Sequence, residues 1–145
     1  MREMAIYEVD ELSFEVPDGY VDRSMNVFVP PANMMKGTPH NILITREPRS
    51  EETVAQQAAR LLKELASKMP GTKILGQRDR VIGALPGREA RSHGTRNGVP
   101  IYQRQFFVGH YGTLLSLIVT STRAQSAQCD ALAERLLASL KLRRR

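Results

Sequence analysis

Hydrophobic and polar side chains alternate in several short stretches of this sequence, and in two places apolar residues recur at helical spacing. A period of two is typical of half-buried strands, whereas apolar residues every three or four positions form one face of a helix. The alternation predicts a strand pair within residues 6–16 and further strands over residues 24–29, 41–45, 73–82, 88–95, 98–108 and 113–121. The helical spacing predicts helices over residues 50–69 and 124–140.

Turn residues separate these elements. Asn97-Gly98 is the strongest hairpin signal, because both central residues of a type I′ turn need positive φ and these two residue types tolerate it. A turn is also predicted at His110-Tyr111-Gly112, and the sequence Leu85-Pro86-Gly87 is interpreted as another. These turns join the later strands as neighbours, which predicts an antiparallel meander.

The first helix begins and ends at recognisable signals. Ser50 stands where an N-cap is expected, with Glu51 and Glu52 in the first turn near the positive end of the helix dipole. The run 113–121 is apolar on both faces, which predicts a central strand. Strands, helix, meander and helix in this order predict an α+β fold in which an antiparallel β-sheet packs with two main α-helices.

The length and composition are those of one ordinary globular domain. We expect residues 1–145 to form a single domain with a short basic tail at 141–145. The longest apolar run, residues 114–119, is far shorter than a membrane-spanning helix, so the domain is not expected to be membrane-integrated. Acidic residues occupy the place where a signal peptide needs an apolar run, and a single cysteine excludes an internal disulfide, so we expect a cytoplasmic protein.

The net charge of +6 raises the question of nucleic-acid binding. Four of the basic residues lie in the tail at 141–145, and without them the excess falls to +2. No basic stripe interleaved with exposed aromatic residues is visible in the rest of the sequence. No nucleic-acid partner is therefore predicted, although a basic-tail nucleic-acid binder stays open as an alternative.

No motif for catalysis, phosphate binding or metal binding is present. The three histidines, His40, His93 and His110, lack the spacing of metal ligands, and Cys129 lies among apolar residues of the last helix, as expected for a small buried side chain. We therefore predict no enzyme, no metal and no cofactor.

The stretch GVPIYQRQFFV, residues 98–108, has an unusual pattern for a strand. Alternation places Gln103 and Gln105 on one face with Ile101, and Arg104 on the other face with Phe106. Neither face is purely apolar or purely polar. This mixture predicts that the strand contacts something besides the core of its own protein.

The segments SMNVFVP, KMPG, LPG and GVPIYQRQFFV, taken in this order, resemble the Eag (effector-associated) chaperones of bacterial type VI secretion systems, in the DcrB/PsbP-like superfamily. The resemblance covers nearly the whole chain. It implies a homodimer that binds the N-terminal transmembrane region of an effector, often an Rhs protein with a PAAR region. The homodimer would shield those helices until the effector is loaded on the secretion spike, which it would contact only through the effector.

The resemblance also implies a client-binding groove. By position, its residues are Met25, Val27, Leu61, Met69, Ile101, Gln103 and Gln105. Apolar members would cover client side chains, and a glutamine amide can hydrogen-bond the carbonyls and hydroxyls that closely packed helices expose. Met25, Val27 and Ile101 are individually as expected in an ordinary core as in a groove. Met69, at a helix end, is more often a cap contact, and solvent exposure is the simpler interpretation of both glutamines.

The sequence departs from the family at one place. A polar groove residue is expected on the first helix near Leu61, where this chain is apolar, and Gln57 is the candidate to replace it. A small lipid- or ligand-binding domain of the same superfamily remains the main alternative function.

Overall fold

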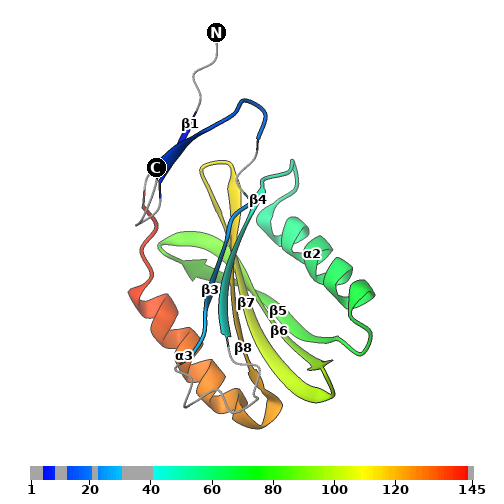
Figure 1. Cartoon of the computed structure of the whole chain (residues 1–145). Coiled ribbons are helices and arrows are strands. Elements are labelled where there is room, and N and C mark those ends of the chain that lie inside the picture. Colours follow the sequence, from blue (N-terminus) through cyan, green and yellow to red (C-terminus); the bar gives the residue numbers. More distant parts are fainter. Residues whose placement is uncertain (1–4, 9–12, 21–22, 31–40, 144–145) are drawn as a thin grey trace.

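A six-stranded antiparallel sheet with one helix on each face forms the body of the protein (Figure 1). The computed structural model describes residues 5–8, 13–20, 23–30 and 41–143. The sheet order is β3-β4-β8-β7-β6-β5, and β1 and β2 form a separate two-stranded sheet. This confirms the predicted α+β class. The element bounds are β1 Ala5–Glu8, β2 Ser13–Val16, β3 Met25–Phe28, β4 Asn41–Pro48, α2 Val54–Lys68, β5 Lys73–Ile82, β6 Leu85–Arg96, β7 Val99–His110, β8 Thr113–Thr122, the 3₁₀ helix η1 Arg123–Gln125 and α3 Ser126–Ser139.

The helix α2 begins later than the sequence predicts. Its N-cap is Thr53, whose side-chain oxygen accepts a hydrogen bond from the backbone N–H of Gln56, while the Gln56 side chain accepts one from the backbone N–H of Thr53. This reciprocal capping box satisfies two donors at the helix end. Ser50 instead accepts a hydrogen bond from the backbone N–H of Glu52, in the turn before the helix. The prediction of Ser50 as the N-cap was therefore wrong.

The hairpin turns follow the sequence in two cases out of three. Asn97 and Gly98 have φ values of 52° and 79°, and Tyr111 and Gly112 have values of 48° and 74°, which confirms both turns. The turn between β5 and β6 lies at residues 83–84, not at 85–87, because Leu85, Pro86 and Gly87 pair with β5. A Cβ on Gly87 would lie 2.6 Å from the backbone oxygen of Phe107, so close strand packing accounts for this glycine.

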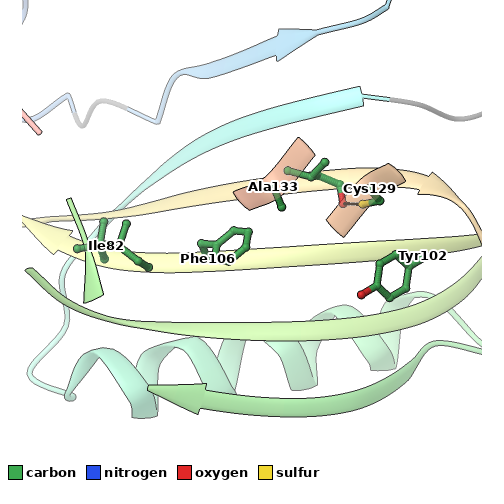
Figure 2. Close-up of a cluster of buried hydrophobic side chains, with 7 residues drawn as sticks. Ile82, Tyr102, Phe106, Cys129 and Ala133 are labelled. Atoms are coloured by element: carbon green, nitrogen blue, oxygen red, sulfur yellow. Dashed lines mark hydrogen bonds between the residues drawn. The ribbon is translucent and has the colours of Figure 1, made fainter. Parts of the chain in front are cut away.

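The larger core cluster lies between the sheet and α3. Figure 2 shows Ile82, Tyr102 and Phe106 on the strands, with Cys129 and Ala133 on the helix. Leucines that recur at helical spacing in α3 and at its C-cap form a stripe that packs against this cluster. Its residues are Leu132, Leu136, Leu137 and Leu140.

A smaller cluster lies between the sheet and α2. It contains Ala58 and Leu62 of the helix and Ala90, Phe107 and Leu114 of the sheet. Phe106 and Phe107 are neighbours in β7 and belong to opposite clusters, which confirms the predicted alternation of this strand. β8 lies between β4 and β7, as predicted for a strand that is apolar on both faces. In the part of the chain that the structure describes, no helix is long and apolar enough to cross a membrane.

Candidate functional site

The sheet face that carries α2 is only partly covered. The helix packs on β5, β6 and β7, and the same face continues over β8, β4 and β3. On the edge strand β3, the side chains of Met25 and Val27 are 59% and 57% exposed. Such strong exposure of two large apolar side chains on the same face of one strand is typical of an interaction surface.

The strand register extends this apolar surface inward. Val27 pairs with Leu43, Leu43 with Ile118, and Ile118 with Gln105, so these four side chains form one row across four strands. Met25 begins a second row with Thr45 of β4. We call the surface formed by Met25, Val27, Leu43, Thr45 and Ile118 the open face.

Exposure decreases along this row. Val27 is exposed, Leu43 and Ile118 are half-buried, and Gln105 is only 3% exposed. Within the described residues, the open face thus extends from the outermost strand, β3, toward the part of the sheet that α2 covers. The sequence did not reveal Leu43 and Ile118 as members, because the register that brings them beside Val27 depends on pairing between strands far apart in the chain.

Gln103 and Gln105 form a hydrogen-bonded amide pair at the inner border of the open face. The Gln105 Nε2 donates to Gln103 Oε1 at 3.4 Å, and the Gln103 Nε2 donates to the hydroxyl of Thr120 at 3.1 Å. The Ser92 hydroxyl donates to Gln103 Oε1 at 3.5 Å. Solvent exposure is therefore the wrong interpretation of Gln105, whose amide is held inside the fold.

The other residues assigned to the groove lie in different environments. Leu61 is partly buried against the cluster under α2, and Met69 is the C-cap of that helix. Ile101 shares the face of the glutamines, yet it is 2% exposed and belongs to the interior. Gln57, the proposed polar substitute near Leu61, is buried and donates from Nε2 to the carbonyl of Pro48 at 3.0 Å. It therefore joins α2 to the end of β4.

The opposite face of β7 explains the arginine between the two glutamines. Arg104 is 3% exposed and donates to Glu89, Asp130 and Glu134 at 3.0, 3.0 and 3.2 Å. Glu89 is 2% exposed and also accepts hydrogen bonds from Arg78 and Arg80. We call these six residues, from β5, β6, β7 and α3, the ion cluster. Because Asp130 and Glu134 belong to α3, the cluster fixes the helix on the sheet.

The arginines of the ion cluster favour the ionised forms of Glu89 and Glu134. Hydrogen bonds from Arg80, and to a smaller extent from Arg104, lower the pKa of Glu134 to about 2 despite the opposing effect of burial. Burial works against ionisation of Glu89, but its arginine partners outweigh it and lower the pKa of this carboxyl. Burial and a 2.7 Å hydrogen bond to Asp130 raise the pKa of Tyr102 to about 12.

The single cysteine has an environment that disfavours its reactive form. Cys129 is buried, its Sγ lies 3.5 Å from the backbone oxygen of Val119, and burial raises the pKa of its thiol. A raised pKa disfavours the nucleophilic thiolate. Within residues 5–8, 13–20, 23–30 and 41–143, no group of three or more His, Cys, Asp or Glu side chains is arranged to hold a metal ion.

A mainly apolar pocket lies on the α3 side of the sheet, behind the open face. Its volume is about 360 Å³. Phe28, Ile42 and Val119 line it from the strands, and Cys129 and Leu132 line it from α3. Gln125 and Gln128 add polar groups beside the first turn of the helix. This size and lining suit a small apolar ligand.

The sequence and the fold agree with one protein family. A model of the DcrB family matches residues 11–139, and the chain belongs to this family. Among characterised relatives, Effector EagT6 of Pseudomonas aeruginosa PAO1 is 25% identical over 121 residues, which are 83% of this chain and 84% of that protein. The resemblance to the Eag proteins seen in the sequence is thereby confirmed.

Solved structures show the same fold. PA94, a Pseudomonas aeruginosa protein of unknown function, superposes with a TM-score of 0.82 at 23% identity, over 99% of this chain and 100% of that one. LpqN, involved in cell envelope biogenesis of Mycobacterium tuberculosis, gives 0.55 at 12% identity over 81% of this chain and 83% of that one. PsbP of Synechocystis sp. PCC 6803 gives 0.56 at 11% identity over 94% of this chain and 89% of that one.

Proposed function

We propose that this protein is a non-enzymatic, cytoplasmic chaperone or adaptor that binds the N-terminal transmembrane helices of a type VI secretion effector. Clients of the Rhs type with a PAAR region are the class that the Eag resemblance suggests. The observation that carries the proposal is the open face, in which exposed apolar side chains on β3 continue inward to the paired amides of Gln103 and Gln105.

The chemistry of the open face suits a transmembrane helix outside the membrane. Such a helix satisfies its own backbone hydrogen bonds, so its apolar side chains are what must be covered in water. Met25, Val27, Leu43 and Ile118 offer apolar area for this purpose. Gln103, which is only partly buried, can offer an amide to a small polar side chain or carbonyl of the client.

The dimensions of the open face favour a homodimer. The row from β3 to β7 crosses three inter-strand spacings, or about 14 Å. A membrane-spanning helix of about 20 residues is about 30 Å long. One chain therefore covers roughly half of a client helix, and two copies of the open face would cover it all. We include a homodimer in the proposal on this ground.

The test is co-expression with the N-terminal apolar segment of an effector encoded next to this gene, followed by affinity purification without detergent. We expect the segment to co-purify with the native protein and to be lost with Val27→Asp. Val81→Asp is the matched control, because Val81 is 70% exposed at the far edge of the sheet on β5. Retention of the segment by Val27→Asp, or its loss with both variants, would remove the open face from the site.

A second candidate function rests on the apolar pocket beside α3. Its volume of about 360 Å³ is in the range of small-ligand sites, and it supports the alternative of a lipid- or ligand-binding domain. Thermal stabilisation by medium-chain fatty acids would favour this alternative. Leu132→Trp, which fills the pocket, should abolish the stabilisation, whereas Val27→Asp should leave it unchanged.

A further inference from the structure

The sheet surface beside α3 carries an excess of positive charge. The basic residues that form it are far apart in the sequence and come together only in the fold. α3 packs on β7 and β8, and on the same face β5 and β6 extend beyond it. Six basic side chains gather there against the three carboxylates of the ion cluster, for a net charge of +3. They are Lys73, Arg78, Arg80, Arg91, Arg104 and Arg123.

Three of these side chains are available to a partner. Lys73, Arg91 and Arg123 are exposed, and none forms an ion pair with a described carboxylate. All three lie near His93. Lys73 pairs with His93 across the two strands, Arg91 precedes it by two residues on the same face of β6, and Arg123 donates to the backbone oxygen of Gly94 at 3.5 Å. We call Lys73, Arg78, Arg91 and Arg123 the basic platform. Arg78 also pairs with Glu89 of the ion cluster, whereas the other three charges have no carboxylate partner among the described residues. Like charges held together in this way attract an acidic partner.

The basic platform borders a free sheet edge. β5 pairs with β6 on one side and with no other described strand, so the N–H and C=O groups of its outer side lack strand partners. The bulge between Ile74 and Gly76 disturbs only the first part of the strand, and residues 77–82 pair regularly with β6. An edge of this kind can accept an additional strand.

Several symmetric pairings of this edge with a second copy of the chain are unfavourable. In a symmetric antiparallel pairing of two β5 strands, one residue lies opposite its own counterpart. Registers centred on Arg78, Asp79 or Arg80 therefore place like charges directly opposite each other, which destabilises the pair. A register centred on Gln77 runs into the bulge. Self-association centred on residues 77–80 is thus disfavoured, whereas a strand of different charge can pair there.

The two faces of β5 define the chemistry of such a strand. On the α3 side, Lys73 and Arg78 stand beside the exposed Arg91 of β6. On the α2 side, Val81 is 70% exposed. We infer that β5 and the basic platform bind an extended segment of a protein partner in which acidic and apolar residues alternate, added antiparallel or parallel to β5. This site lies on the other face and at the other edge of the sheet from the open face.

The geometry favours a peptide over a nucleic acid. Strand addition pairs the free N–H and C=O groups of β5 with those of another peptide backbone. A nucleic-acid phosphate backbone does not offer this alternation of donors and acceptors. Stacking platforms for bases need exposed aromatic rings, and Tyr102, the aromatic residue next to His93 on this face, is only 4% exposed.

Fluorescence anisotropy of the full chain with a labelled decapeptide of alternating Glu and Val tests the inference, with a Gln/Val decapeptide and a labelled DNA duplex of similar length as comparisons. At about 50 mM salt, where screening is weak, we expect the Glu/Val peptide to bind most tightly. The double variant Lys73→Gln/Arg91→Gln should weaken binding of this peptide roughly five- to tenfold, which is the effect expected from losing two partly exposed ion pairs. Lys63→Gln/Lys68→Gln on α2 is the matched control and should change binding less than about twofold.

Amide hydrogen exchange measured by NMR supplies the second readout. The bound Glu/Val peptide should protect backbone amides within residues 77–82, and Val27→Asp should leave both binding and protection intact. Absence of binding, equal binding of the Gln/Val peptide, or binding without protection of β5 would overturn the inference. Tighter binding of the duplex with the same dependence on Lys73 and Arg91 would overturn it in favour of a nucleic-acid surface.

Discussion

Replacing Arg104 with methionine tests how much the ion cluster contributes to folding. The Arg104 side chain is 3% exposed and makes hydrogen bonds to three carboxylates. In the variant, Asp130 and Glu134 can be hydrated, because their side chains are 41% and 49% exposed, whereas Glu89 stays buried at 2%. Removing one partner of a buried ion pair costs about 3–5 kcal/mol. Arg78 and Arg80 still neutralise Glu89, so we expect the lower end, about 3 kcal/mol.

Urea unfolding followed by circular dichroism measures this loss in the free energy of unfolding. For a domain of this size, about 3 kcal/mol corresponds to a decrease of about 6–12 °C in Tm. Arg91→Met is the control, since Arg91 is exposed and forms no ion pair with a described carboxylate, and it should cost less than about 0.5 kcal/mol. The double variant Arg104→Met/Glu89→Met should be more stable than Arg104→Met, because no buried carboxylate remains. A loss below about 1 kcal/mol for Arg104→Met would refute the assignment of the cluster as the clamp of α3.

Three further predictions follow from local geometry. Thr53→Ala removes the side-chain cap of α2 and should cost about 1 kcal/mol in urea unfolding, whereas Ser50→Ala should have a much smaller effect. Gly87→Ala should destabilise the protein by about 2 kcal/mol, because its Cβ would lie 2.6 Å from both the Ile82 side chain and the Phe107 backbone oxygen; an unchanged Tm would contradict that close approach. The pKa of Glu134 is lowered from 4.5 to about 2, so its stabilising effect is complete above about pH 4.5 and is lost as the pH falls toward 2. Because the Glu134 side chain is half-exposed, this effect is small. Arg80→Met removes its main partner, so the free energy of unfolding should fall less steeply with decreasing pH in the variant.

Much of the fold could be predicted from the sequence because its signals are local. The Asn97-Gly98 turn, the doubly apolar strand β8 and the leucine stripe of α3 each depend on residues a few positions apart. The N-cap was misplaced because Ser50 and Thr53 are equally suitable residue types, and only the reciprocal bond to Gln56 distinguishes them. The turn at 85–87 was misplaced because Pro86 and Gly87 suit turns, whereas here close contact with β7 requires the glycine.

The candidate sites were predicted less completely because they depend on pairing between distant strands. Met25 and Val27 were assigned from the sequence, but their neighbours Leu43 and Ile118 follow only from the strand register. Ile101 was assigned with them although it is buried. Alternation shows which residues share a face of the sheet, but not what covers that face. The basic platform escaped detection for the same reason, because β5, β6 and η1 each contribute only one or two of its charges.

The alternation of β7 restricts how this chain can change in length during evolution. Residues 101, 103 and 105 border the α2 side, while Tyr102 and Arg104 hold α3. Inserting or deleting a single residue inside the strand would exchange the two sets and send the arginine to the side of the amides. When homologous sequences are aligned, gaps are therefore expected in the turns at 97–98 and 111–112 and not between them. A homologue that breaks this pattern should also have a rearranged α3.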